Sequence, residues 1–144
     1  MANLTITPAD VLPSTSAIFV SGPSYVAGED IDAGEFLYRK TSDGLYYLAD
    51  NSTAEKSTVI GVAAANSAQG QRLIIIIQDD TCDVNGAATQ GRVYALSDTP
   101  GKIREISEIA TTADIFLIPV AQGGASGTSI SFRFNAPRAG VQND

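Results

Sequence analysis

The sequence predicts an all-β protein: a small antiparallel β-barrel or sandwich of short strands with an extended N-terminal arm. Glycine is frequent, with 13 in 144 residues, and short apolar runs lie between turn signals. Short strands separated by frequent turns are typical of sandwiches and barrels. A chain of this length buries roughly two-thirds of its unfolded surface, which is enough for one domain. We expect an arm over residues 1–16, a domain over residues 17–136 and a polar tail over residues 137–144.

The central hairpin is expected within residues 59–78. Its first strand covers residues 59–63, and its second covers residues 72–78, which include four consecutive isoleucines. A β-branched run this short favours a strand over a helix. Because the run does not alternate with polar residues, we expect both of its faces to be dry. One face can pack on the chain's own core, and the other needs a second layer or another protein chain.

Further strands are expected over residues 17–20, 36–39, 45–48, 93–96, 115–118 and 130–135. Gly22-Pro23 closes the first of them. Asp43-Gly44 marks a hairpin, because these residues accept the positive φ of a tight turn. Pro100-Gly101 marks another, with Ile103 in the returning strand. Pro119 favours a strand end or a sheet edge, since it lacks an N–H.

Residues 1–16 are expected to form an extended arm that buries little against its own domain. Such ends are usually disordered unless something holds them, and a partner chain is the economical candidate. The isoleucine run calls for a partner on the same grounds. The candidate partner-binding residues are therefore the apolar side chains of the arm and of that run: Leu4, Ile6, Val11, Leu12, Ile74, Ile75, Ile76 and Ile77.

The acidic balance excludes several kinds of partner. The net charge is −7 and the pI is about 4.4. Nucleic-acid binding needs a basic surface, and an anionic membrane repels an acidic one. No stretch reaches the ~18 apolar residues of a membrane span. The N-terminus lacks the charged and apolar regions of a signal peptide, so we expect a protein made and used without secretion.

The sequence offers little for catalysis, and we expect no catalytic, cofactor-binding or metal-ligating residues. The chain contains no histidine, which excludes a Ser-His-Asp triad, a Cys-His pair and imidazole ligands. No Walker A loop or dinucleotide fingerprint is present. The single cysteine, Cys82, is expected to be a small, partly buried apolar residue rather than a nucleophile, because nothing activates it.

Two groups of residues leave an alternative open. Asp79, Asp80 and Asp83 could bind a hard cation such as Ca²⁺, although a solvated turn that shields the isoleucine run is the favoured interpretation. Four tyrosines could line a binding surface, although half-buried strand positions are more usual for them. These tyrosines are Tyr38, Tyr46, Tyr47 and Tyr94.

Five segments, taken in order, resemble phage capsid cement proteins, also called decoration proteins. They are the arm MANLTIT and residues 27–38, 43–50, 60–71 and 91–103. The most characteristic part is the alanine-rich strand followed by Gly70-Gln71. The resemblance covers roughly the first hundred residues, together with the terminal strand near residues 130–135.

The resemblance implies a β-barrel or sandwich bound outside an icosahedral head, where it stabilises contacts between major capsid subunits. Its partners would be the major capsid protein and further copies of itself, with a trimer favoured and a dimer possible. It would be made in the host cytoplasm and located on the outer capsid surface of the virion. The alternative function is a carbohydrate- or receptor-binding module of a head fibre or tail, using exposed tyrosines and the acidic segment.

Overall fold

The computed structural model describes residues 3–4, 6–84, 90–106, 119–123 and 129–134, which form an all-β fold, as predicted. A 3₁₀ turn, η1, precedes the strands. The elements are η1 (Pro8–Asp10), β1 (Ile18–Val26), β2 (Phe36–Arg39), β3 (Tyr46–Leu48), β4 (Gly61–Ala63), β5 (Arg72–Asp83), β6 (Val93–Leu96), β7 (Ile103–Glu105), β8 (Pro119–Gly123) and β9 (Ser129–Arg133).

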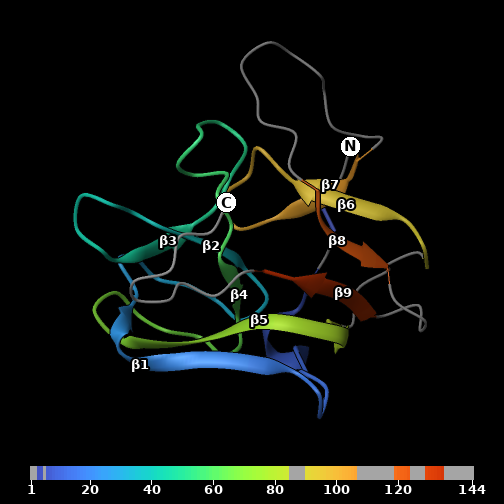
Figure 1. The fold of residues 1–144 in the computed structure, drawn as a ribbon, viewed down its shortest axis with the longest axis horizontal. Helices are drawn as coiled ribbons and strands as arrows, with labels where there is room; N and C mark the ends of the chain where they lie inside the picture. The colour runs from blue at the N-terminus through green and yellow to red at the C-terminus, as the bar shows by residue number, and fades with distance from the viewer. Residues whose placement is uncertain (1–2, 5, 85–89, 107–118, 124–128, 135–144) are drawn as a thin grey trace.

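The strands form one strongly curved antiparallel sheet (Figure 1). Eight strands follow one another in the order β3-β2-β4-β5-β9-β8-β6-β7, and β1 adds to the other edge of β5. The turn between β6 and β7 returns to the beginning of this path. There the Phe36 N–H donates to the Gly101 carbonyl over 3.0 Å, and the Gly101 N–H donates to the Ala49 carbonyl over 2.7 Å. These bonds bring the two ends of the sheet together into a partly closed barrel.

The central hairpin is confirmed as the pair β4–β5, with Val62 opposite Ile76. The second strand is longer than predicted, because β5 continues through the acidic segment that we expected to be a turn. Its first half pairs with β1 and β4, and its second half pairs with β9. A register shift between Asp79 and Cys82 accommodates the acidic residues, and Cys82 then lies opposite Ile130. The prediction of a turn was wrong because the pairing with β9 outweighs the weak strand preference of aspartate.

The first strand is also longer than the sequence indicated. The Gly22-Pro23 pair does not close it, and β1 runs on to Val26 with an irregular register between Ser21 and Val26. Proline is tolerated here because β1 has a neighbour on one side only, so its missing N–H breaks no ladder bond. Gly22 has a φ of +129°, which a residue with a side chain rarely adopts.

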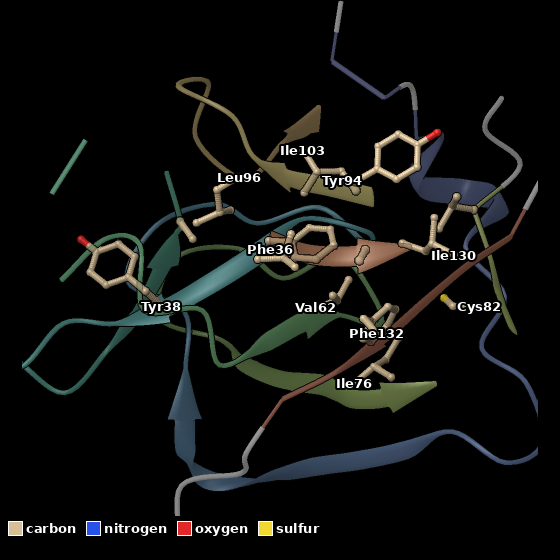
Figure 2. Close-up of a cluster of buried hydrophobic side chains, with 14 residues drawn as sticks. Phe36, Tyr38, Val62, Ile76, Cys82, Tyr94, Leu96, Ile103, Ile130 and Phe132 are labelled. Atoms are coloured by element: carbon tan, nitrogen blue, oxygen red, sulfur yellow. The ribbon is translucent and has the colours of Figure 1, made fainter. Parts of the chain in front are cut away.

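Two apolar clusters lie on the two faces of β5. Ile76 belongs to the barrel core around Phe36, Val62 and Phe132, whose side chains point toward one another in Figure 2. Ile75 and Ile77 belong to a second cluster. Both faces of the run are therefore dry over Ile75, Ile76 and Ile77, as predicted. The prediction was wrong for Ile74, which is 47% exposed because it lies opposite the small Ser21. The second layer comes from the chain itself, through Ala27, Ile31, Leu37, Tyr46 and their neighbours.

The other predicted strands are confirmed wherever the structure describes them. Strands β2 and β3 pair across Asp43-Gly44, and β6 and β7 pair across Pro100-Gly101. Strand β8 begins at Pro119. In β9 the side chains of Ile130 and Phe132 are buried, whereas Arg133 is exposed. The strand expected at residues 115–118 and the tail at residues 137–144 lie outside the described residues.

Substituting Gly61 with alanine is expected to destabilise the fold. A Cβ at this position would meet Ile75 Cγ2 and would lie 2.8 Å from the Ile76 carbonyl oxygen, which belongs to the backbone of β5. Overpacking of this kind costs about 1–3 kcal/mol. Urea denaturation of Gly61→Ala checks the loss. Ala65→Ser, at an exposed position of the same hairpin, serves as the control. Equal midpoints for the two variants would contradict this account of the β4–β5 contact.

Candidate functional site

The N-terminal arm lies against its own barrel, contrary to the expectation that it buries little there. Leu4, Ile6 and Val11 are partly buried and pack on the barrel core. Gly34 provides the seat for the arm, because a Cβ at that position would meet Ile6 and would come within 3.0 Å of Val11 Cγ2. The missing side chain therefore lets the arm approach the backbone closely. The prediction was wrong because it was made from the residues of the arm alone. Those residues do not show that Gly34, in the barrel, leaves room for them.

Polar contacts fix the beginning of the arm to β7 and to the turn before it. The Leu4 N–H donates to the Ile103 carbonyl over 2.8 Å. The Asn3 side-chain oxygen accepts hydrogen bonds from Ser97 Oγ over 2.6 Å and from Arg104 Nη2 over 3.0 Å. A bond to the charged guanidinium is stronger than one between neutral groups. These contacts attach the beginning of the arm to β7, a strand that does not pair with β5.

The end of the arm is attached to β5 through backbone and side-chain bonds. Leu12 and Asp83 exchange two backbone hydrogen bonds, of 2.7 and 3.0 Å. Asp79, which is 1% exposed, accepts bonds from the Ser14 N–H over 2.8 Å and from Ser14 Oγ over 2.5 Å. It also accepts one from the Thr81 N–H. A buried carboxylate needs such donors, so Asp79 and Ser14 form a clamp between the arm and β5.

This clamp decides what the acidic residues do. Asp79 is engaged with the arm, Asp80 is exposed, and Asp83 pairs its backbone with Leu12. Within the described residues, no three Cys, Asp or Glu side chains gather closely enough to hold a metal ion. The geometry therefore gives Asp79 a structural role in fastening the arm.

The eight candidate partner-binding residues differ widely in accessibility. Ile75, Ile76 and Ile77 are enclosed by the chain's own clusters, so the need for a partner at that run is met internally. Leu12 is 66% exposed and Ile74 is 47% exposed. These two lie at opposite ends of β5, because Leu12 faces Asp83 and Ile74 faces Ser21. Nine residues of strand separate them by roughly 30 Å, so they belong to different surfaces.

Leu12 stands beside a shallow hollow formed by the arm and the end of β5. The hollow has a volume of about 380 Å³ and is lined by Ala9, Asp10, Val11, Leu12 and Asp83. An exposed leucine at the rim of this depression gives another protein an apolar side chain to cover. We call this the arm surface.

The second exposed apolar surface was predicted only in part, because the sequence analysis named Ile74 and missed Ile18 and Phe19. Ile18 and Phe19 of β1 are 45% and 44% exposed, and Phe19 lies diagonally across from Ile74 of β5. We call Ile18, Phe19 and Ile74 the β1 strip. An apolar run such as residues 17–20 normally indicates a core strand, so its exposure cannot be recognised without knowing that β1 lies at an edge. A third exposed position, Val93, lies on β6, away from both surfaces.

The tyrosines do not form an exposed platform. Tyr38, Tyr46 and Tyr94 are buried, and only Tyr47 of the four is partly exposed. Tyr47 lies over Gly28, where a Cβ would overlap its ring, and Lys40 Nζ lies 5.3 Å from the ring centroid. The Tyr47 hydroxyl donates to Asp43 over 2.6 Å. This cluster fixes the β2–β3 hairpin.

Cys82 of β5 is fully buried and lies opposite Ile130 of β9. Burial, together with the nearby Asp79 and Asp83, raises the pKa of its thiol to about 12. The thiol therefore stays protonated at neutral pH and packs as a small apolar side chain, which suits neither nucleophilic attack nor metal binding.

Comparison with known proteins identifies no relative: no family model matches the chain, and no curated protein matches it. No helix among the described residues has the length and apolar character of a membrane span. The function must therefore be argued from the two exposed apolar surfaces and the attached arm.

Replacing Asp79 with asparagine is expected to loosen the arm. The amide nitrogen would face a donor at Ser14 or Thr81, and losing a bond to a buried charged acceptor costs about 1–3 kcal/mol. Thermal or urea unfolding measures the loss, and limited proteolysis should show faster cleavage within residues 6–16. Asp80→Asn, at an exposed position, is the control. If both variants were cleaved at the wild-type rate, Asp79 would not be the clamp.

The Tyr47 hydroxyl is expected to lose its proton at a higher pH than an ordinary tyrosine. Its hydrogen bond to Asp43 raises the pKa of Tyr47 to about 12, above the ordinary tyrosine value of 10.0. Because the folded pKa exceeds the unfolded one, the stabilisation from this bond is complete below pH 10 and is lost as the pH approaches 12. Ultraviolet absorbance is measured against pH for the wild type and for Tyr47→Phe. The difference between the two curves gives the ionisation of Tyr47. Asp43→Asn should return the pKa toward 10; an unchanged titration would show that Asp43 does not cause the shift.

Proposed function

We propose that this protein is a phage capsid cement protein, which binds the outside of a head and stabilises contacts between major capsid subunits. The arm surface supports this proposal best. There the chain holds Leu12 at 66% exposure on a segment that two sets of hydrogen bonds attach to the barrel. A rigidly held apolar side chain loses little conformational entropy when a partner covers it.

Three further features support the same function. The described segments that resemble cement proteins belong to an all-β fold, which is the architecture that the resemblance implies. The net charge of −7 suits the outer side of a head and opposes contact with packaged DNA. Many copies act together on a particle, so a small interface on each copy is sufficient.

The alternative, a carbohydrate- or receptor-binding module, has weaker support. It depends on exposed tyrosines and on a free acidic segment. Three of the four tyrosines are buried, and the Asp79 carboxylate is occupied by Ser14 and Thr81. No described feature favours this alternative over the cement function.

Co-sedimentation with heads of the encoding phage that have been stripped of this protein tests the proposal. We expect a fixed, saturable ratio of copies to major capsid subunits and heads that better resist heat. Leu12→Ser should weaken binding about tenfold or more, because burying a leucine contributes roughly 1.5–3 kcal/mol.

Val93→Ser is the matched control, since it removes an exposed apolar side chain from β6 and should bind like wild type. Failure of the wild-type protein to bind expanded heads would refute the cement function. Equal binding by the Leu12 and Val93 variants would refute the arm surface as the point of contact.

A further inference from the structure

The ends of the sheet differ in how their outer edges are covered. Among the residues that the structure describes, three strands have a single strand neighbour: β3, β7 and β1. The outer edge of β3 is bonded by residues after β1, since the Gly28 N–H donates to the Tyr46 carbonyl over 2.8 Å. The edge of β7 is bonded by the arm through Leu4 and Ile103. Within the described part of the chain, no backbone bond reaches the outer edge of β1.

The β1 strip lies along this open edge. Phe19 is opposite Ile76 and Ser21 is opposite Ile74, so Phe19 and Ile74 are diagonal neighbours on one face. Diagonal pairs lie about 7–8 Å apart, close enough for large side chains to form one patch. Ile18 extends the patch along β1. An open strand edge combined with exposed large apolar residues is a ready template for pairing with another strand.

The charge of this region indicates the kind of strand that fits. Residues 17–26 contain no charged side chain, whereas the whole chain carries −7. Two copies of such an acidic chain repel each other over most of their surfaces and approach with least repulsion at an uncharged segment. A basic partner would instead be drawn to the acidic faces. A second copy offers an equally uncharged, apolar and unpaired strand, so the two edges are complementary to each other.

We propose that β1 pairs antiparallel with β1 of a second copy of this chain, about a two-fold axis. Pro23 has no N–H and Gly22 has a φ of +129°, which together restrict regular pairing to residues 18–21. Opposite residues of an antiparallel pair share a face, so the two-fold axis passes beside a single residue. With the axis at Val20, each Phe19 lies opposite the Ser21 of the other copy. Such an isologous contact closes as a dimer and cannot generate the trimer that the family resemblance favours.

The test is sedimentation equilibrium of the full chain over a range of concentrations, with Phe19→Lys as the main variant. Wild type should dimerise, and Phe19→Lys should raise the dissociation constant at least tenfold. Val93→Lys, which places the same charge on β6, should behave like wild type. Ser21→Asp adds a charge at an exposed position of β1 without removing an apolar side chain, and should also weaken the dimer if Phe19→Lys fails to fold.

Amide hydrogen exchange supplies a second readout. Outward amides within residues 18–21 should gain protection as the wild-type concentration rises, and those of the Phe19 variant should not. A monomer at every concentration, a trimer, or variants that associate like wild type would overturn the proposal. So would a Phe19 variant that keeps its oligomeric state but loses binding to heads, because the β1 strip would then belong to the capsid. The oligomeric state is measured without heads, so failure of the cement function leaves this test intact.

Discussion

The structure depends on the apolar character of both faces of β5. This strand pairs with β1, β4 and β9, and its alternating side chains enter two clusters. Ile76 lies in the barrel core, while Ile75 and Ile77 require a second layer, which the segment after β1 provides. Fully burying each such side chain contributes about 1.5–3 kcal/mol. The fold therefore requires apolar side chains on both faces of β5. A strand with one polar, solvent-exposed face could not take its place.

The arm depends on the same strand. Because β5 continues past the isoleucine run, its acidic end lies where the arm crosses, and Asp79 receives the donors of Ser14. A buried carboxylate without these donors would be costly, so the arm and the acidic end stabilise each other. This coupling explains why an acidic, turn-like sequence forms a strand here. It also means that the apolar arm surface is presented in one fixed position.

Local patterns were enough to predict much of this architecture, because hairpins such as β2–β3 are determined by neighbouring residues and by turn chemistry at Gly44. The sequence also predicted the two dry faces of Ile75, Ile76 and Ile77. The sequence could not predict which apolar residues stay exposed. Phe19 and Val62 both lie in short apolar runs, and their burial differs because their strands occupy different places in the sheet. The Ser14–Asp79 clamp joins residues that are 65 positions apart. Patterns of neighbouring residues contain no information about such a pair.

The two exposed surfaces are separated in a way that suits different tasks. The arm surface places the exposed Leu12 at the rim of a shallow hollow, so it favours a partner with an apolar pocket. The β1 strip has no charge and an open backbone edge, so it favours another neutral strand. Because roughly 30 Å of β5 separates Leu12 from Ile74, one surface can be occupied while the other stays free. A dimer formed through β1 would carry two arm surfaces, and two modest contacts held together bind a particle far more tightly than either one alone.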